Sequence, residues 1–159
     1  MAYTTIKKPS DYFNTVLYTG NGSTNAQTGV GFQPDFTWIK SRSNAENHNL
    51  FDAVRGATKR IRSNGAEAED TRTTSLTAFD SDGFTLGSGS QVNTSGWTFA
   101  SWNWKANGQG SSNTDGSITA TVSANTTAGF SIIDFTGNET NSTVGHGLSS
   151  TPQVYIIKN

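Results

Sequence analysis

Short runs of apolar residues alternate with polar residues along most of the chain, and Gly, Asn, Asp and Ser separate the runs. Runs of this length that are rich in aromatic and β-branched residues are typical of β-strands. Strands are predicted in this way over residues 15–19, 36–41, 50–53, 75–79, 83–86 and 97–105. Further strands are predicted nearer the end of the chain, over residues 117–123, 131–135 and 154–157. The only helix candidate is a single turn over residues 66–70, so the pattern predicts an all-β protein.

Two segments carry more specific signals. Residues 80–83 read Asp-Ser-Asp-Gly between two apolar pairs, which predicts a hairpin turn whose glycine adopts a positive φ. In the segment 97–105, alternation places Trp97 on one face and both Trp102 and Trp104 on the other. Large apolar groups on both faces indicate a central strand that is covered on each side.

Two stretches of the chain, residues 13–40 and 130–158, resemble each other. Each starts with a strand that opens with Phe, continues through an aromatic-Thr-Gly-Asn turn and a polar loop with Gly-x-Gly, and then has a proline and a second strand ending in Ile-Lys. This fixed order favours a true internal repeat over chance similarity of polar loops. The equivalent pairs are Phe13 and Phe130, Tyr18 and Phe135, Gly20 and Gly137, Asn21 and Asn138, Gly29 and Gly145, Gly31 and Gly147, Pro34 and Pro152, and Ile39 and Ile157.

The repeat divides the chain into an N-terminal arm (1–12), a β-sandwich module (13–106), a Gly/Ser/Asn-rich linker (107–116) and a partial second β module (117–159). The second copy stops just after its second strand, whereas the first copy continues with further strands. We therefore expect either a continuation of the natural chain or strands from another subunit to complete the second module, and we favour continuation. The predicted architecture is a β-sandwich of jelly-roll or lectin-like type, followed by the start of a second, similar β module.

Composition excludes several classes of protein. Hydrophobic residues make up 32% and charged residues 14% of the chain, which disfavours both a helical bundle and a charged disordered tail. The net charge of −1 provides no field to attract nucleic acid, and the one basic cluster, residues 59–62, is followed by acidic residues. The lack of cysteine excludes disulfides and thiolate metal sites. No apolar run approaches the roughly 18 residues that span a bilayer, and the start lacks the pattern of a signal peptide.

The sequence gives only weak evidence for metal-binding or catalytic residues. Asp80 and Asp82 give the segment 80–83 some likeness to a calcium loop, but the twelfth position counted from Asp80 is Gln91 instead of the required Glu. A hydrolase would depend on Asp52, Asp80 or Asp82, yet these carboxylates lie in polar turns without an apolar pocket to raise a pKa. His146 takes the place of Val30 in the repeat, which disfavours catalysis there. No catalytic residue, metal ligand or cofactor is predicted, and an enzyme is disfavoured.

Three residues are candidate glycan contacts: Trp97, Asp52 and Arg55. Trp97 follows Ser95-Gly96 and is the tryptophan expected to be most exposed, so its ring could stack on a sugar face. Asp52 and Arg55 lie close together in sequence and could make polar contacts to a sugar. The alternative interpretation of this pair, an ion pair that braces a loop, is favoured.

Several short sequence motifs of the first module resemble a repeated domain in virion proteins of marine tailed phages. These motifs are residues 18–22, 29–35, 38–43, 50–58, 76–84 and 102–105, and the resemblance resumes from residue 130 to the end. The resemblance implies lectin-like sandwiches in head or tail appendages. The resemblance assigns no catalytic residues to this chain, because the matching motifs are structural turns and strand ends.

The resemblance leads to a functional expectation. The protein is expected to be a non-enzymatic virion structural protein, a head fibre, decoration or tail fibre, that acts in particle assembly or host-surface attachment. Its expected partners are other capsid or tail proteins, further copies of itself in a trimer that covers edge strands, and a host surface glycan, with no nucleic acid and no membrane span. The alternative is a carbohydrate-binding, lectin-like module of an extracellular protein.

Overall fold

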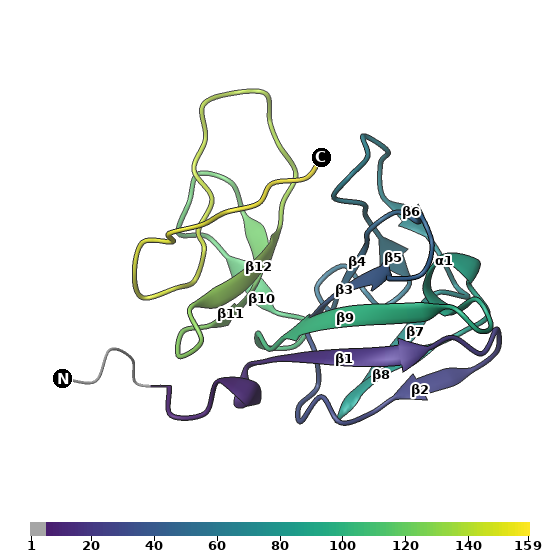
Figure 1. Cartoon of the computed structure of the whole chain (residues 1–159). Helices are drawn as coiled ribbons and strands as arrows, with labels where there is room; N and C mark the ends of the chain where they lie inside the picture. Colours follow the sequence, from purple (N-terminus) through teal and green to yellow (C-terminus); the bar gives the residue numbers. More distant parts are fainter. Residues whose placement is uncertain (1–5) are drawn as a thin grey trace.

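The computed structural model describes residues 6–159, and its regular secondary structure consists almost entirely of antiparallel β-strands (Figure 1). The strands are β1 (Phe13–Thr19), β2 (Asn25–Gln27), β3 (Phe36–Ser41), β4 (Asn49–Asp52), β5 (Lys59–Arg60), β6 (Asp70–Thr71), β7 (Leu76–Asp80), β8 (Gly83–Leu86), β9 (Thr98–Trp104), β10 (Ser111–Asn113), β11 (Ala120–Asn125) and β12 (Phe130–Asp134). A short 3-10 helix η1 (Pro9–Asp11) and one helical turn α1 (Ser90–Asn93) are the helical elements of this part of the chain. The predicted all-β class is therefore confirmed.

Residues 13–106 form a β-sandwich. One sheet has the strand order β1-β9-β3-β4 and the other has the order β2-β8-β7. The side chains that fill the space between them form one buried cluster, drawn from both sheets and from the segment before β9: Ile39, Phe51, Leu76, Phe84, Leu86, Val92 and Phe99. A small β5-β6 ribbon joins β4 through a bridge between Leu50 and Ile61. The burial of a single apolar layer between two sheets is what holds this first module together.

Strand β9 is central, as predicted, because it pairs with β1 on one side and β3 on the other. Its two faces differ in character. Phe99, Ser101 and Asn103 are buried toward the sandwich core, where the Asn103 Oδ1 accepts a hydrogen bond of 3.0 Å from the Thr37 hydroxyl. Trp102 and Trp104 lie on the opposite face and are only partly buried. The core below β9 is thus partly polar, and the large indole rings point outward.

The predicted hairpin turn is confirmed. Asp80 pairs with Gly83 at the turn between β7 and β8, and Gly83 has a φ of 151°. A Cβ at Gly83 would lie 1.9 Å from the carbonyl oxygen of Gln27, so the neighbouring backbone excludes any side chain there. Glycine is therefore required at this turn both by its dihedral angle and by the close approach of β2.

The remaining strands form a separate three-stranded sheet of order β10-β11-β12, which lies beside the end of β9 (Figure 1). The Phe130 ring of β12 stacks on the Trp104 ring with centroids 6.0 Å apart and meets the Phe36 ring edge-on at 6.1 Å. Directly after the first module, the Asn107 N–H also donates to the Ser123 hydroxyl at 2.8 Å. These contacts dock the sheet of residues 111–134 onto the first module.

Several predicted elements differ from the structure. Residues 154–157 form no strand, and residues 66–70 form no helical turn. Residues 107–116, predicted as a linker, include β10, because Ser111–Asn113 pairs with β11. Of the predicted N-terminal arm, residues 1–5 lie outside the described part, and the rest carries η1.

Candidate functional site

Asp52 and Arg55 brace the turn that follows β4. The Asp52 carboxylate accepts hydrogen bonds from the backbone N–H of Arg55 at 2.9 Å and from its Nε at 2.7 Å. The Arg55 guanidinium also reaches the Glu69 carboxylate at 3.0 Å. The Asp52 and Arg55 side chains are 4% and 13% exposed, so little of either could touch a ligand. The geometry agrees with the loop-bracing ion pair that the sequence analysis favoured.

Trp97 lies just before β9, and its ring packs against the buried cluster of the sandwich. Its carbonyl accepts a hydrogen bond of 2.8 Å from the Gly20 N–H, and its own N–H donates to Thr94. This ring is therefore less open than its position after Ser95-Gly96 suggested. The described contacts do not bring it together with Asp52 or Arg55, so its role as a glycan contact stays a prediction.

The aspartates of the β7–β8 turn also serve the framework. The Asp82 carboxylate accepts hydrogen bonds from the N–H groups of Gly29 at 3.0 Å and Gly31 at 2.6 Å. The Asp80 carboxylate accepts a hydrogen bond of 2.7 Å from the Thr85 hydroxyl. No cluster within residues 6–159 has the His, Asp or Glu groups needed to hold a metal ion. The likeness of this turn to a calcium loop is thus explained by its role in closing the Gly-x-Gly loop.

A partly open aromatic surface lies on the outward side of the four-stranded sheet. We call this surface the outer face, and its residues are Thr15, Leu17, Trp38, Lys40, Ala100 and Trp102, which the strand register places side by side. The Trp38 and Trp102 rings meet edge-on with centroids 6.4 Å apart, and Leu17 is 60% exposed. Sequence reasoning missed this surface because it expected both faces of the strand over residues 97–105 to be covered. The polar residues Ser101 and Asn103 at alternate positions of β9 were the available signal.

His48 fixes the orientation of the Trp38 ring. The Trp38 Nε1–H donates a hydrogen bond of 2.8 Å to the His48 Nδ1, and the two rings are 5.5 Å apart. Burial and the nearby Lys40 ammonium lower the pKa of His48, which favours the neutral ring that can accept this hydrogen bond. An aromatic surface with a fixed indole and a neighbouring cation can stack on a flat ligand or a partner's side chain.

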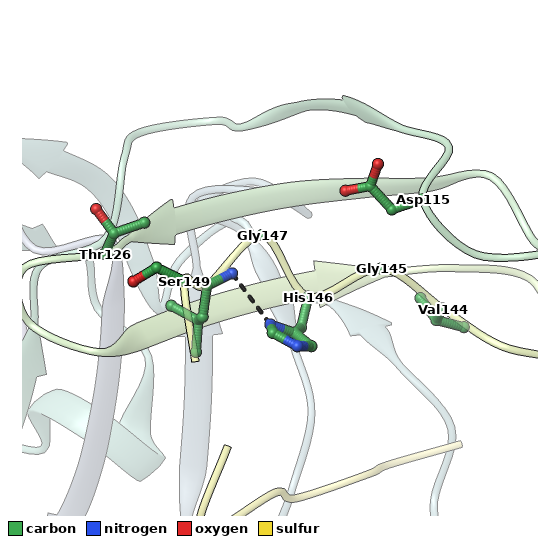
Figure 2. A pocket seen from close by; sticks show the side chains of 8 residues that line it. Asp115, Thr126, Val144, Gly145, His146, Gly147 and Ser149 are labelled. Atoms are coloured by element: carbon green, nitrogen blue, oxygen red, sulfur yellow. Dashed lines mark hydrogen bonds between the residues drawn. The ribbon is translucent and has the colours of Figure 1, made fainter. Parts of the chain in front are cut away.

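A polar pocket of about 470 Å³ lies between the loop of residues 144–149 and the chain at Asp115 and Thr126 (Figure 2). Residues 144–149 line it together with Asp115 and Thr126. The His146 Nδ1 accepts a hydrogen bond of 3.0 Å from the Leu148 N–H, so this nitrogen is occupied within its own loop. Figure 2 shows the Asp115 carboxylate across the pocket from that ring.

Comparison with known proteins adds a family but no activity. Neither helix of the described residues is long and apolar enough to cross a membrane. No curated protein and no solved structure matches the chain. A family described as a domain of unknown function, DUF7483, matches residues 8–159, and the chain therefore belongs to this family.

Proposed function

We propose that the protein is a non-enzymatic structural module of a phage virion, a unit of a head fibre, a decoration protein or a tail fibre. The observation that carries this proposal is the outer face, where Leu17 is 60% exposed beside the partly open Trp38 and Trp102. Contiguous apolar surface of this kind suits attachment to another protein. The resemblance of the first-module motifs to phage appendage proteins is the support for the particle as its place of action.

The carboxylates that a hydrolase would use also favour a structural role. Asp52 is held by Arg55, and Asp82 is held by the N–H groups of the Gly29–Gly31 loop. A catalytic acid or base needs a free lone pair or proton directed at a substrate. Carboxylates that already close turns are better suited to fixing the shape of the surface.

Incorporation into particles tests the proposal. The wild-type chain, Leu17→Asp and Ala68→Asp would each be expressed during infection, and particles would be purified on a density gradient. Leu17 and Ala68 are both exposed apolar residues, but only Leu17 lies on the outer face. The wild-type chain and Ala68→Asp are expected in the particle fraction, and Leu17→Asp in the soluble fraction. Wild-type protein that stays out of the particles would overturn the proposal.

A second candidate is carbohydrate binding on the same face. The observation that favours it is the Trp38–Trp102 pair, whose rings are partly open and lie beside His48 and Lys40. Exposed indole rings stack on sugar faces, and polar neighbours give orientation. A glycan array followed by titration would separate the sites. Binding lost in Trp102→Ala places the sugar on the outer face, whereas binding lost only in Trp97→Ala places it at the contact predicted from the sequence.

A further inference from the structure

Four residues after position 130 repeat residues of the first module but have lost their surroundings. Tyr18 illustrates the first module. Its ring stacks on the Phe99 ring at 5.2 Å, its hydroxyl donates to the Val92 carbonyl at 2.7 Å, and burial raises its pKa well above the usual value. Its equivalent, Phe135, is 41% exposed. An aromatic ring that is fixed in one copy is therefore open to solvent in the other.

The glycines two residues further on differ in the same way. A Cβ at Gly20 would lie 2.2 Å from the carbonyl oxygen of Thr94, and the Gly20 N–H donates to the Trp97 carbonyl at 2.8 Å. The close approach of the chain at residues 93–97 thus requires glycine at this position. At Gly137 no atom of the described chain, apart from the glycine and its two chain neighbours, lies within 4 Å of the position of a Cβ. Nothing in the chain explains the lack of a side chain there.

The asparagines that follow show the same difference. The Asn21 N–H donates to the Asn93 Oδ1 at 3.0 Å, and the Asn21 Oδ1 accepts from the Asn93 Nδ2 at 3.1 Å. The Asn138 side chain bonds only within its own loop, where its Oδ1 accepts from the Ser142 hydroxyl at 2.8 Å and from Thr140. The repeat therefore keeps an asparagine whose long-range partner is present only in the first module.

The second strand of the repeat completes the pattern. Ile39 is fully buried in β3, which lies between β9 and β4. Its equivalent, Ile157, is 72% exposed, and its neighbours Val154, Tyr155 and Ile156 are 79%, 80% and 74% exposed. Strand β12, the equivalent of β1, pairs only with β11, so its other edge is open within the described chain.

Each of the four first-module residues has a partner in one segment, residues 92–104, which runs from the end of α1 through β9. We propose that β12 and residues 153–158 form an acceptor for a partner segment of the same pattern as residues 92–104. The segment would pair antiparallel with the open edge of β12, as β9 pairs with β1. Residues 154–157 would pair with its other side, as β3 pairs with β9.

The chemistry of the occupant follows from the groups it must satisfy. It carries an asparagine at the position of Asn93, to bond Asn138, and a backbone carbonyl that approaches Gly137. It continues as a strand with a large apolar residue at the position of Phe99, to cover Phe135. It thus converts an exposed apolar segment into the middle of a sheet, which removes both open apolar surface and an unpaired strand edge.

Binding of a labelled peptide tests the proposal on the full chain. A fluorescein-labelled peptide with the sequence of residues 88–106 would be titrated with the protein and followed by fluorescence anisotropy. Saturable binding is expected, and a peptide with Asn93→Ala is expected to bind roughly tenfold more weakly or worse. Hydrogen exchange should slow at residues 131–135 and 154–157 when the peptide is bound.

Gly137→Ala is the decisive variant because the free protein has room for its methyl group and the filled acceptor has none. Its thermal unfolding should equal that of the wild type, while its peptide affinity falls by roughly tenfold or more. The neighbouring Thr136→Ala adds no atoms at this contact and should bind normally. Equal binding to Gly137→Ala, equal binding of a scrambled peptide, or the lack of saturable binding would overturn the proposal. Self-association of the chain that is lost on Ile156→Asp would also overturn it, in favour of a second copy as the occupant.

Discussion

The first module (residues 13–106) and the second region (residues 117–159) use one sequence pattern with very different degrees of packing. In the first module the aromatic-Thr-Gly-Asn turn is enclosed by residues 93–97, and each of its groups has a partner. In the second region the equivalent residues, 135–138, are exposed to solvent, as the 41% exposure of Phe135 illustrates. The difference teaches that these motif residues encode a contact with a later segment, and that the turn itself can form without that contact.

Substitution of the paired glycines should give the largest difference between the two parts. Gly20→Ala places a methyl carbon 2.2 Å from a backbone oxygen, which cannot move aside as a side chain would. Overpacking of this kind should lower the free energy of unfolding by about 3 kcal/mol. Gly137→Ala should change it by less than about 0.5 kcal/mol, because the position is open. Chemical denaturation of both variants measures the two values, and equal losses would show that the comparison is wrong.

Loss of the buried Asn93 side chain should have the next largest effect. This side chain is 0% exposed, and its Nδ2 donates to the Ser23 carbonyl at 2.6 Å and the Gly87 carbonyl at 2.7 Å. Asn93→Ala removes this buried amide and leaves both carbonyls without their donor, which should cost about 2 kcal/mol. Asn138, the equivalent of Asn21, has no such buried partner, so Asn138→Ala removes only bonds within a solvent-exposed loop and should cost much less. Thermal unfolding of the two variants would test the ranking.

The junction of the two parts should be weaker than either glycine or asparagine contact in the first module. Phe130 stacks on Trp104 at 6.0 Å and is itself only partly buried. Phe130→Ala should therefore cost about 1 kcal/mol, which is typical of one aromatic pair and well below the loss of a fully buried ring. Hydrogen exchange should speed up in β11 and β12 and stay unchanged in β7 and β8. Faster exchange throughout the sandwich would mean that the two parts unfold together.

Much of the fold of the first module could be predicted from the sequence because its strands carry strong local signals. The bounds of β3 and β8 were predicted without error, and the hairpin glycine was identified from Asp-Ser-Asp-Gly alone. Short strands such as β2 and β10 were missed, since their polar sequences form strands only because a neighbour supplies the pairing. The strand predicted at 154–157 is wrong for the converse reason: its local signal is strong, but no described strand pairs with it.

The candidate site was harder to predict because it depends on which face of a strand meets the core. Trp102 and Asn103 are neighbours in β9, and hydrophobicity alone would bury the tryptophan. The structure buries Asn103, whose amide is satisfied by Thr37 and Asn14, and leaves Trp102 partly open. Hydrogen bonds between distant residues decided the orientation, and the sequence of one strand does not reveal them.

The smallest predicted effect is an acid sensitivity that belongs to the first module. Arg60 is 2% exposed, and its guanidinium donates to the Asp70 carboxylate at 2.6 and 2.9 Å as well as to Gln91. The hydrogen bond from Arg60 lowers the pKa of Asp70 below its ordinary value of 3.8, against an opposing contribution from burial. A depressed pKa in the folded state means that the stabilisation is complete above the ordinary pKa and is lost as the pH falls through the lower, folded value.

The free energy of unfolding should therefore decline as the pH falls below about 4, and Asp70→Asn should flatten this decline. Tryptophan fluorescence is the appropriate probe, because all four tryptophans lie in the first module. Asp134→Asn, which changes an exposed carboxylate of β12, would serve as the control and should keep the decline of the wild type. An unchanged acid slope in the tryptophan signal of Asp70→Asn would show that the Arg60–Asp70 pair is not what couples the first module to pH. Other carboxylates of the sandwich would then have to carry that coupling.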